Sequence, residues 1–204
     1  MKPIYDYFMR GVALFAASVA VPALAKADAP SPVQAAHAAV VLFGQTCAAN
    51  LGRPQAAEAA IRQAGFGIAP KPVSERLLNG KPGQVWIPPE TDSRVTVLMQ
   101  PNATACQVYT GWGTIPALQA NFRELVESAG GSGLKVQKEQ DRDVDTDGMR
   151  LHLIEYRLSL IGPRTKQLDR VLALTTNAAP DALVVGAMTA ALVPDARPGE
   201  PVGH

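Results

Sequence analysis

The stretch from 95 to 109 constrains the fold most, because it has the pattern of a β-hairpin and contains one of only two cysteines. Apolar residues alternate with other residues on both sides of a Pro-Asn-Ala-Thr turn, which is typical of two half-buried antiparallel strands. This turn predicts that Met99 pairs with Cys106 and that Val97 pairs with Val108. One face of the hairpin is therefore expected to be apolar and to carry the Cys106 thiol.

The first 25 residues have the pattern of a secretory signal peptide. Lys2 and Arg10 form a basic flank, an apolar run follows at 11–21, and residues 23–25 form an Ala-Leu-Ala cleavage site. Residues 27–29, Ala-Asp-Ala, offer a second cleavage site. The apolar run is shorter than the roughly 20 residues that a spanning helix needs. We therefore expect cleavage, no membrane span in the mature chain, and a periplasmic or secreted protein.

The second cysteine lies in a helical pattern. Val33, His37, Val40 and Cys47 recur at helical spacing, which predicts that they share the inward face of one helix and that His37 lies at the edge of the core. Two cysteines in an exported chain favour a disulfide over two free thiols. We therefore expect a Cys47–Cys106 bond that joins this helix to the sheet.

Thiol and zinc chemistry find little support in the sequence. A Cys–His pair would need Cys47 or Cys106 beside His37 or His152, but both cysteines lie on apolar faces and are expected to be oxidised together. The spacing of these four residues matches no zinc motif. No cofactor is expected.

Length and composition indicate one domain of ordinary size. The chain has 204 residues, a formal net charge of +1 and 47% hydrophobic residues, which provides a core but no basic excess for nucleic acid. After the signal peptide, residues 26–193 are expected to form one domain. Residues 194–204 contain three prolines and are expected to form a disordered tail.

The order of helical and strand patterns predicts the fold class. Helices are expected at 31–47, 54–65, 74–79 and 114–129, and strands at 84–88, 95–99, 105–109, 134–138, 149–160, 170–176 and 182–192. This order predicts an α+β fold, with a single antiparallel sheet of about six or seven strands and helices packed on one face.

An acidic segment resembles the start of a calcium loop. Asp143, Asp145 and Asp147 alternate and are followed by glycine, as in the D-x-D-x-D-G pattern. The twelfth position is Ile154 where a bidentate Glu is needed, and Glu155 is one residue late. An Asp-Gly pair between two strand patterns is also a hairpin turn. We therefore predict a solvated hairpin loop and no functional metal site, with calcium as the weaker alternative.

Three aromatic residues are candidates for a ligand groove. Tyr109 and Trp112 lie beside two glycines at a junction between a strand and a helix, and Trp86 lies on an earlier strand. Such aromatics can line a shallow groove for a ligand or a partner strand. The alternative is a turn with one aromatic closing the core, with Trp86 as a core residue.

Four segments carry a resemblance to known proteins. They are Phe43 to Cys47, Leu78 to Trp86, Cys106 to Val108 and Leu172 to Asn177. On these segments the chain resembles a group of small exported proteins of Gram-negative bacteria that have no assigned activity. The resemblance implies a periplasmic location and a disulfide-bearing α+β domain, and it implies no mechanism.

Two functions from different classes remain open. The leading expectation is a non-enzymatic module that binds an envelope protein or a small ligand, because no catalytic motif is present. The alternative is a hydrolase acting on a cell-envelope polymer. A cleft with two carboxylates of perturbed pKa would favour the hydrolase, whereas a flat apolar patch or an open sheet edge would favour the binding module.

Overall fold

The computed structural model describes residues 29–89, 94–130, 134–146, 148–160, 169–179 and 184–193. The expected signal peptide and C-terminal tail lie outside these residues. The strands are β1 (Gly67–Ile68), β2 (Gln84–Ile87), β3 (Val95–Met99), β4 (Ala105–Thr110), β5 (Leu134–Thr146), β6 (Met149–Leu160), β7 (Asp169–Asn177) and β8 (Gly186–Val193). The helices are α1 (Pro32–Phe43), α2 (Pro54–Gln63), α3 (Lys71–Leu78) and α4 (Ile115–Ala129), with a π-helical turn η1 (Gly44–Ala48) after α1 and a 3-10 turn η2 (Pro101–Ala103).

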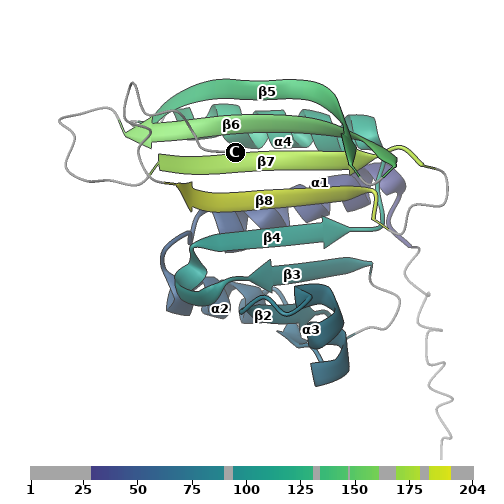
Figure 1. Ribbon diagram of the computed structural model, residues 1–204, viewed down its shortest axis with the longest axis vertical. Coiled ribbons are helices and arrows are strands. Elements are labelled where there is room, and N and C mark those ends of the chain that lie inside the picture. Colours follow the sequence, from purple (N-terminus) through teal and green to yellow (C-terminus); the bar gives the residue numbers. More distant parts are fainter. Residues whose placement is uncertain are drawn as a thin grey trace, which may run out of the picture.

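The fold is α+β and is built on one antiparallel sheet of eight strands in the order β1-β2-β3-β4-β8-β7-β6-β5 (Figure 1). The prediction of six or seven strands was one strand short. The missing strand is β1, which pairs through Gly67 and Ile68 alone and is too short to show an alternating pattern.

The central hairpin has the predicted register. Val97 pairs with Val108, and Met99 pairs with Cys106. Cys106 is joined to Cys47 in η1, with the two Cα atoms 5.2 Å apart. The disulfide predicted from the sequence is therefore present, and it fixes the end of the first helical segment against β4.

The helices α1 and α4 pack side by side behind the sheet in Figure 1. The Phe43 and Phe122 rings lie 6.1 Å apart between these helices, and Tyr156 of β6 lies 6.3 Å from Phe122. Both phenylalanines are fully buried. The helix-covered face of the sheet therefore carries the main core, as one layer of helices on one layer of strands requires.

The third helix does not lie on this face, which corrects the expectation that the helices pack on one face only. In Figure 1 α3 lies in front of β2, whereas α1 and α4 lie behind the sheet. Trp86 of β2 is buried on the helix-covered face beneath Arg62 of α2, so its neighbour Val85 points forward. Val85 is nevertheless fully buried, because α3 covers it.

The inward face of α1 also differs from the prediction. Val33 is 58% exposed and His37 is exposed, whereas Ala36 and Ala39 are buried. A Cβ added to Gly113 would lie only 3.2 Å from the Ala36 Cβ, so the small residues allow α1 to approach the sheet closely. The sequence pattern predicted that Val33 lies on the inward face of α1. Close packing instead requires the smaller alanines, Ala36 and Ala39, on that face.

The acidic segment lies in strand β5 and not in a loop. β5 continues past the predicted end at residue 138 because a β-bulge between Lys138 and Gln140 shifts the alternation by one residue. The hairpin itself is present: Thr146 pairs with Met149, and Gly148 has a φ of 76°, as a tight turn requires. Asp147 lies outside the described residues.

Candidate functional site

A row of polar and small residues crosses the helix-covered face near one end of the sheet. Asp143 pairs with His152, His152 with Thr176, Thr176 with Gly186, and Gly186 with Thr110. These residues come from β5, β6, β7, β8 and β4 in that order. The next inward row contains the fully buried Ile154, Leu174, Met188 and Val108. The polar row therefore marks the place where the apolar core ends.

His152 is held between two carboxylates. Its Nδ1 lies 2.8 Å from Asp143 Oδ1, and its Nε2 lies 3.0 Å from Asp141 Oδ1. Each ring nitrogen thus lies within hydrogen-bond distance of one carboxylate. Together with two basic side chains, these three residues form an ionic cluster that fixes the plane of the ring.

Basic side chains complete this cluster. Arg150 donates from Nη2 to Asp143 Oδ2 at 2.7 Å, and Lys138 donates from Nζ to Asp141 Oδ2 at 3.1 Å. The hydrogen bond from His152, and then that from Arg150, holds the pKa of Asp143 below its usual value. For Asp141 the pKa is also lowered, chiefly by the hydrogen bond from Lys138. Both carboxyl groups are therefore held in the ionised form.

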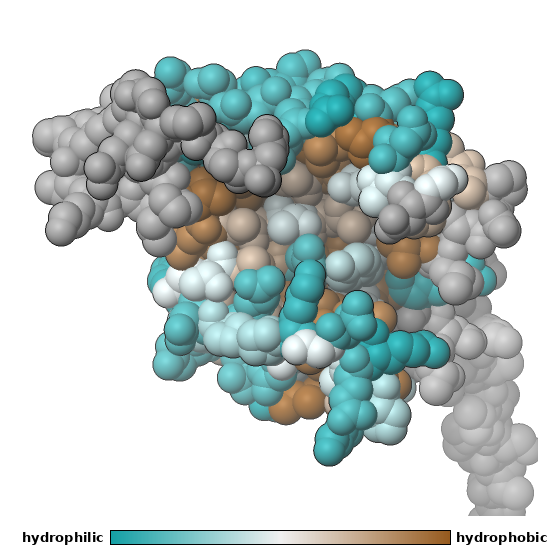
Figure 2. Space-filling view, in the orientation of Figure 1, coloured by the Kyte–Doolittle hydropathy of each residue, from teal (hydrophilic) through white to brown (hydrophobic). Residues whose placement is uncertain are grey.

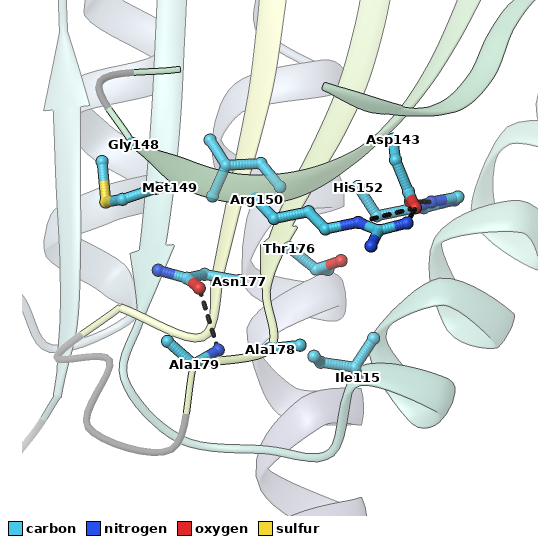
Figure 3. A pocket seen from close by; sticks show the side chains of 11 residues that line it. Ile115, Asp143, Gly148, Met149, Arg150, His152, Thr176, Asn177, Ala178 and Ala179 are labelled. Carbon is cyan, nitrogen blue, oxygen red and sulfur yellow. Dashed lines mark hydrogen bonds and ion pairs between the residues drawn. The ribbon is translucent and has the colours of Figure 1, made fainter. Parts of the chain in front are cut away.

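A pocket of about 450 Å³ opens beside this cluster (Figure 3). It lies between the turn end of the β5–β6 hairpin, the end of β7 and the start of α4. We call it the histidine pocket, and its lining consists of Ile115, Asp143, Gly148, Met149, Arg150, Leu151, His152, Thr176, Asn177, Ala178 and Ala179. Apolar side chains provide most of its walls, and a few charged or hydroxyl groups converge on it, as in typical small-molecule sites.

The Thr176 hydroxyl lies at the inner wall of the histidine pocket and has no hydrogen-bond partner among the described residues. Thr176 is only 2% exposed. Thr110, in the same row, is equally buried, but its hydroxyl donates to the Trp112 carbonyl at 2.7 Å and accepts the Trp112 N–H at 3.1 Å. Buried polar groups are normally paired, so the Thr176 hydroxyl calls for an explanation.

Exposed apolar side chains gather at the same end of the sheet. Trp112 follows β4, Met149 begins β6 and Val184 precedes β8, and their exposed fractions are 38%, 47% and 38%. In an antiparallel sheet of this order, these strand ends share one edge of the molecule. Of these three, Met149 also lines the histidine pocket, and exposed apolar side chains are typical of a binding surface.

The three aromatic residues predicted to line a groove are not brought together. Trp86 is fully buried on the helix-covered face, with the Arg62 guanidinium 5.1 Å from its ring centre. Tyr109 lies on the opposite face, where its hydroxyl donates to Gln107 Oε1 at 2.9 Å and burial raises its pKa. Trp112 lies beyond the end of β4. Since a sheet separates Trp86 from Tyr109, these two residues do not line one groove.

The front face of the sheet is open and weakly apolar over β7 and β8. Small residues alternate with buried ones along β7 and β8, and Ala173, Thr175, Ala187, Thr189 and Ala191 are half-buried on this face. Figure 2 shows the same region as a pale to brown area edged by hydrophilic residues. An exposed, weakly apolar patch is a feature typical of a binding surface.

Of the residues considered for calcium, Asp143 has other side-chain partners in the described structure. Both Asp143 oxygens accept hydrogen bonds, one from His152 and one from Arg150. Asp145 pairs in register with Arg150, and Asp147 lies outside the described residues. Arg150 thus places a positive charge where a calcium ion would need ligands.

Sequence reasoning missed the histidine pocket, although a signal for it is present. Along β6, His152 occupies the inward position before Ile154, and along β7 Thr176 occupies the inward position after Leu174. Inward positions along a strand are apolar within the core. A polar residue at the next inward position therefore marks the place where the core ends. The pairing of strands distant in the sequence was needed to bring these two positions together.

Comparison with known proteins gives little further information. No protein-family model and no curated protein matches the chain. One structural match is the solution structure of cyanobacterial PsbP (CyanoP) from Synechocystis sp. PCC 6803, with 13% identity and a TM-score of 0.32. That match covers 65% of this chain and 82% of the other. Within the described residues, every helix is too short or too polar to span a bilayer.

Proposed function

We propose that this protein is an exported, non-enzymatic binding module and that the histidine pocket is its site for a small ligand. The observation that carries the proposal is the buried Thr176 hydroxyl without a partner at the pocket wall. Leaving such a group unpaired costs about 1–3 kcal/mol. A ligand atom that bonds to the hydroxyl would recover this free energy.

The shape and lining of the histidine pocket support the same proposal. Its volume of about 450 Å³ is in the usual range for small-molecule sites, roughly 300–1,000 Å³. Met149 and Leu151 offer apolar contact, while Arg150 is held in place by Asp143. The Arg150 side chain is 78% exposed, so its ion pair with Asp143 orients it on the solvent side of the pocket.

The alternative, hydrolysis of a cell-envelope polymer, has less support. A general acid must keep its proton near neutral pH, so its pKa has to be raised. The two carboxyl groups nearest the pocket, Asp141 and Asp143, have lowered pKa values and are bonded to basic side chains. These groups suit a scaffold that positions charge better than they suit proton transfer.

Export to the periplasm or beyond is part of the proposal. The Cys47–Cys106 disulfide supports it, because such bonds persist in oxidising compartments. The signal-peptide pattern and the resemblance to exported Gram-negative proteins point in the same direction. Intact-mass analysis of periplasmic material should give a chain that begins near Lys26. Material that retains Met1 in the membrane fraction would contradict export with cleavage.

Ligand binding can be tested with a pocket-filling variant. Saturation-transfer NMR with a panel of acidic, basic and neutral small amphiphiles should detect binders of the wild-type protein. Ala178→Trp fills the histidine pocket and should abolish their signals. Ala59→Trp, on the exposed side of α2, is the matched control and should leave them unchanged. An empty panel, or signals that survive in Ala178→Trp, would contradict the proposed site.

A further inference from the structure

We infer that the ligand of the histidine pocket is a small organic carboxylate with a short apolar tail. This inference rests on the proposed function and names the chemical class of the ligand. Three features converge on the pocket: the N-terminus of α4, the unpartnered Thr176 hydroxyl and the Arg150 guanidinium.

The N-terminus of helix α4 lies at the histidine pocket. Ile115, its first residue, lines the pocket, and the Thr114 side chain makes no capping hydrogen bond. Pro116 has no N–H, and within the described residues the first-turn N–H groups of Ile115 and Ala117 receive no side-chain cap from Thr114. A helix N-terminus carries about half a positive charge and favours a bound anion.

The Thr176 hydroxyl is the independent observation that a polar ligand group belongs here. Figure 3 shows this hydroxyl on the side of the strand that faces Ile115 and His152. The residue is 2% exposed, and its oxygen has no partner among the described residues. A hydroxyl can donate its proton to a carboxylate oxygen, which is a stronger bond than one to a neutral group.

Arg150 supplies the positive charge on the other side of the pocket. Its Nε and Nη2 donate to Asp143, while no hydrogen bond from Nη1 is found within the described residues. The Asp143 carboxylate is also bonded to His152, so both of its oxygens are engaged. The guanidinium is therefore oriented by Asp143 and keeps a donor for a ligand anion.

The remaining lining selects for an apolar tail. Met149, Leu151, Ala178 and Ala179 are the remaining apolar residues at the pocket besides Ile115. None of them offers a side-chain hydrogen-bond donor or acceptor of ordinary strength. A ligand with one carboxylate and a short alkyl chain matches both the polar and the apolar parts.

The test is isothermal titration of the mature protein with hexanoate, hexan-1-ol and hexylamine, which share one tail and differ in the head group. Hexanoate should bind more tightly than hexan-1-ol by roughly tenfold or more, because one charge-assisted bond has about this effect. Hexylamine should bind most weakly. Thr176→Val and Arg150→Gln should each weaken hexanoate binding by roughly tenfold, with circular dichroism unchanged.

Arg142→Gln is the control for charge. Arg142 pairs with Leu153 on the opposite face of the sheet, so its loss removes the same charge without touching the pocket, and hexanoate affinity should not change. Tighter binding of hexan-1-ol or hexylamine would overturn the carboxylate inference and leave small-ligand binding intact. A further outcome would overturn the carboxylate inference and leave the proposed function intact. In that outcome hexanoate, hexan-1-ol and hexylamine do not bind, while the wider panel yields a ligand that Ala178→Trp blocks. An empty panel would overturn both proposals.

Discussion

Thr110 and Thr176 flank Gly186 in one sheet row, and they differ in a way that a substitution can measure. The Thr110 hydroxyl makes two hydrogen bonds to Trp112, whereas the Thr176 hydroxyl makes none among the described residues. Replacing a bonded threonine with valine leaves the partner unpaired, but replacing an unbonded one removes only a buried polar group.

Thr110→Val should therefore lower the free energy of unfolding by about 1–3 kcal/mol, and Thr176→Val should leave it unchanged or raise it. Urea denaturation with an unchanged m-value is the measurement. Equal losses in both variants would mean that the Thr176 hydroxyl has a partner in the unliganded protein. That result would remove the observation on which the pocket assignment rests.

The carboxyl of Asp143 gives a second prediction, on pH. Its folded-state pKa is lowered by His152 and Arg150, whereas the unfolded value is about 3.9. The carboxyl thus contributes stability above about pH 4, and this contribution is lost as the pH falls through the folded pKa. Between about pH 5 and pH 2, stability should fall more steeply in the wild type than in Asp143→Asn.

The control for this experiment is Asp145→Asn, which removes the same charge two residues further along β5. Its pH profile should follow that of the wild type more closely. Parallel profiles for the wild type and Asp143→Asn would show that Asp143 is not bonded to His152 and Arg150 in solution. The ionic cluster would then not orient Arg150.

Among the elements, the contact between α1 and the junction of β4 with α4 depends on glycine. Gly113 has a φ of 128°, and an added Cβ would lie 3.3 Å from the Ala36 Cα. Both the backbone conformation and the close approach therefore oppose a side chain.

Gly113→Ala should destabilise the protein by about 1–3 kcal/mol. Gly65→Ala is the matched comparison, since Gly65 has a φ of 88° and no atom within 4 Å of an added Cβ. Gly65→Ala should therefore lose only the stability that the strained backbone conformation costs, without the cost of a steric clash. If the two variants melt at the same temperature, α1 does not approach Gly113 as closely as described.

The elements also show why some of the fold was predictable from the sequence. The register of β3 and β4 followed from local alternation and a short turn, which are properties of adjacent residues. The length of β5 did not, because the bulge after Lys138 interrupts the alternation among charged residues. Likewise β1 depends on pairing with β2 and has no signal of its own.

The candidate site was less predictable than the fold for a related reason. His152 and Thr176 are distant in the sequence, and each by itself has the pattern of an ordinary strand residue. Their significance comes from the pairing of β6 with β7 and from the position of Ile115 at the start of α4. Trp86 was a candidate for the groove, but the structure places it in the core. The sequence could not decide between the two, because an aromatic residue on a short strand is compatible with either a groove or a core.

At the scale of the whole molecule, the disulfide joins the helical layer to the sheet across 59 residues of sequence. Closing a loop of this length is expected to contribute about 4 kcal/mol on the chain-entropy account. The double variant Cys47→Ala with Cys106→Ala should lose stability of this order in urea denaturation. Adding a reductant to the wild type should give a similar loss. An unchanged midpoint in both experiments would contradict a structural role for the bond.

Two of the surfaces on which a ligand could bind are the histidine pocket and the open front face over β7 and β8. Methyl-resolved NMR distinguishes them directly when hexanoate is titrated into the mature protein. The largest shifts should occur at Ile115, Met149, Thr176 and Ala178 in the pocket. Shifts centred on Ala187, Thr189 and Ala191 of the open face, or no shifts at all, would contradict the pocket as the binding site.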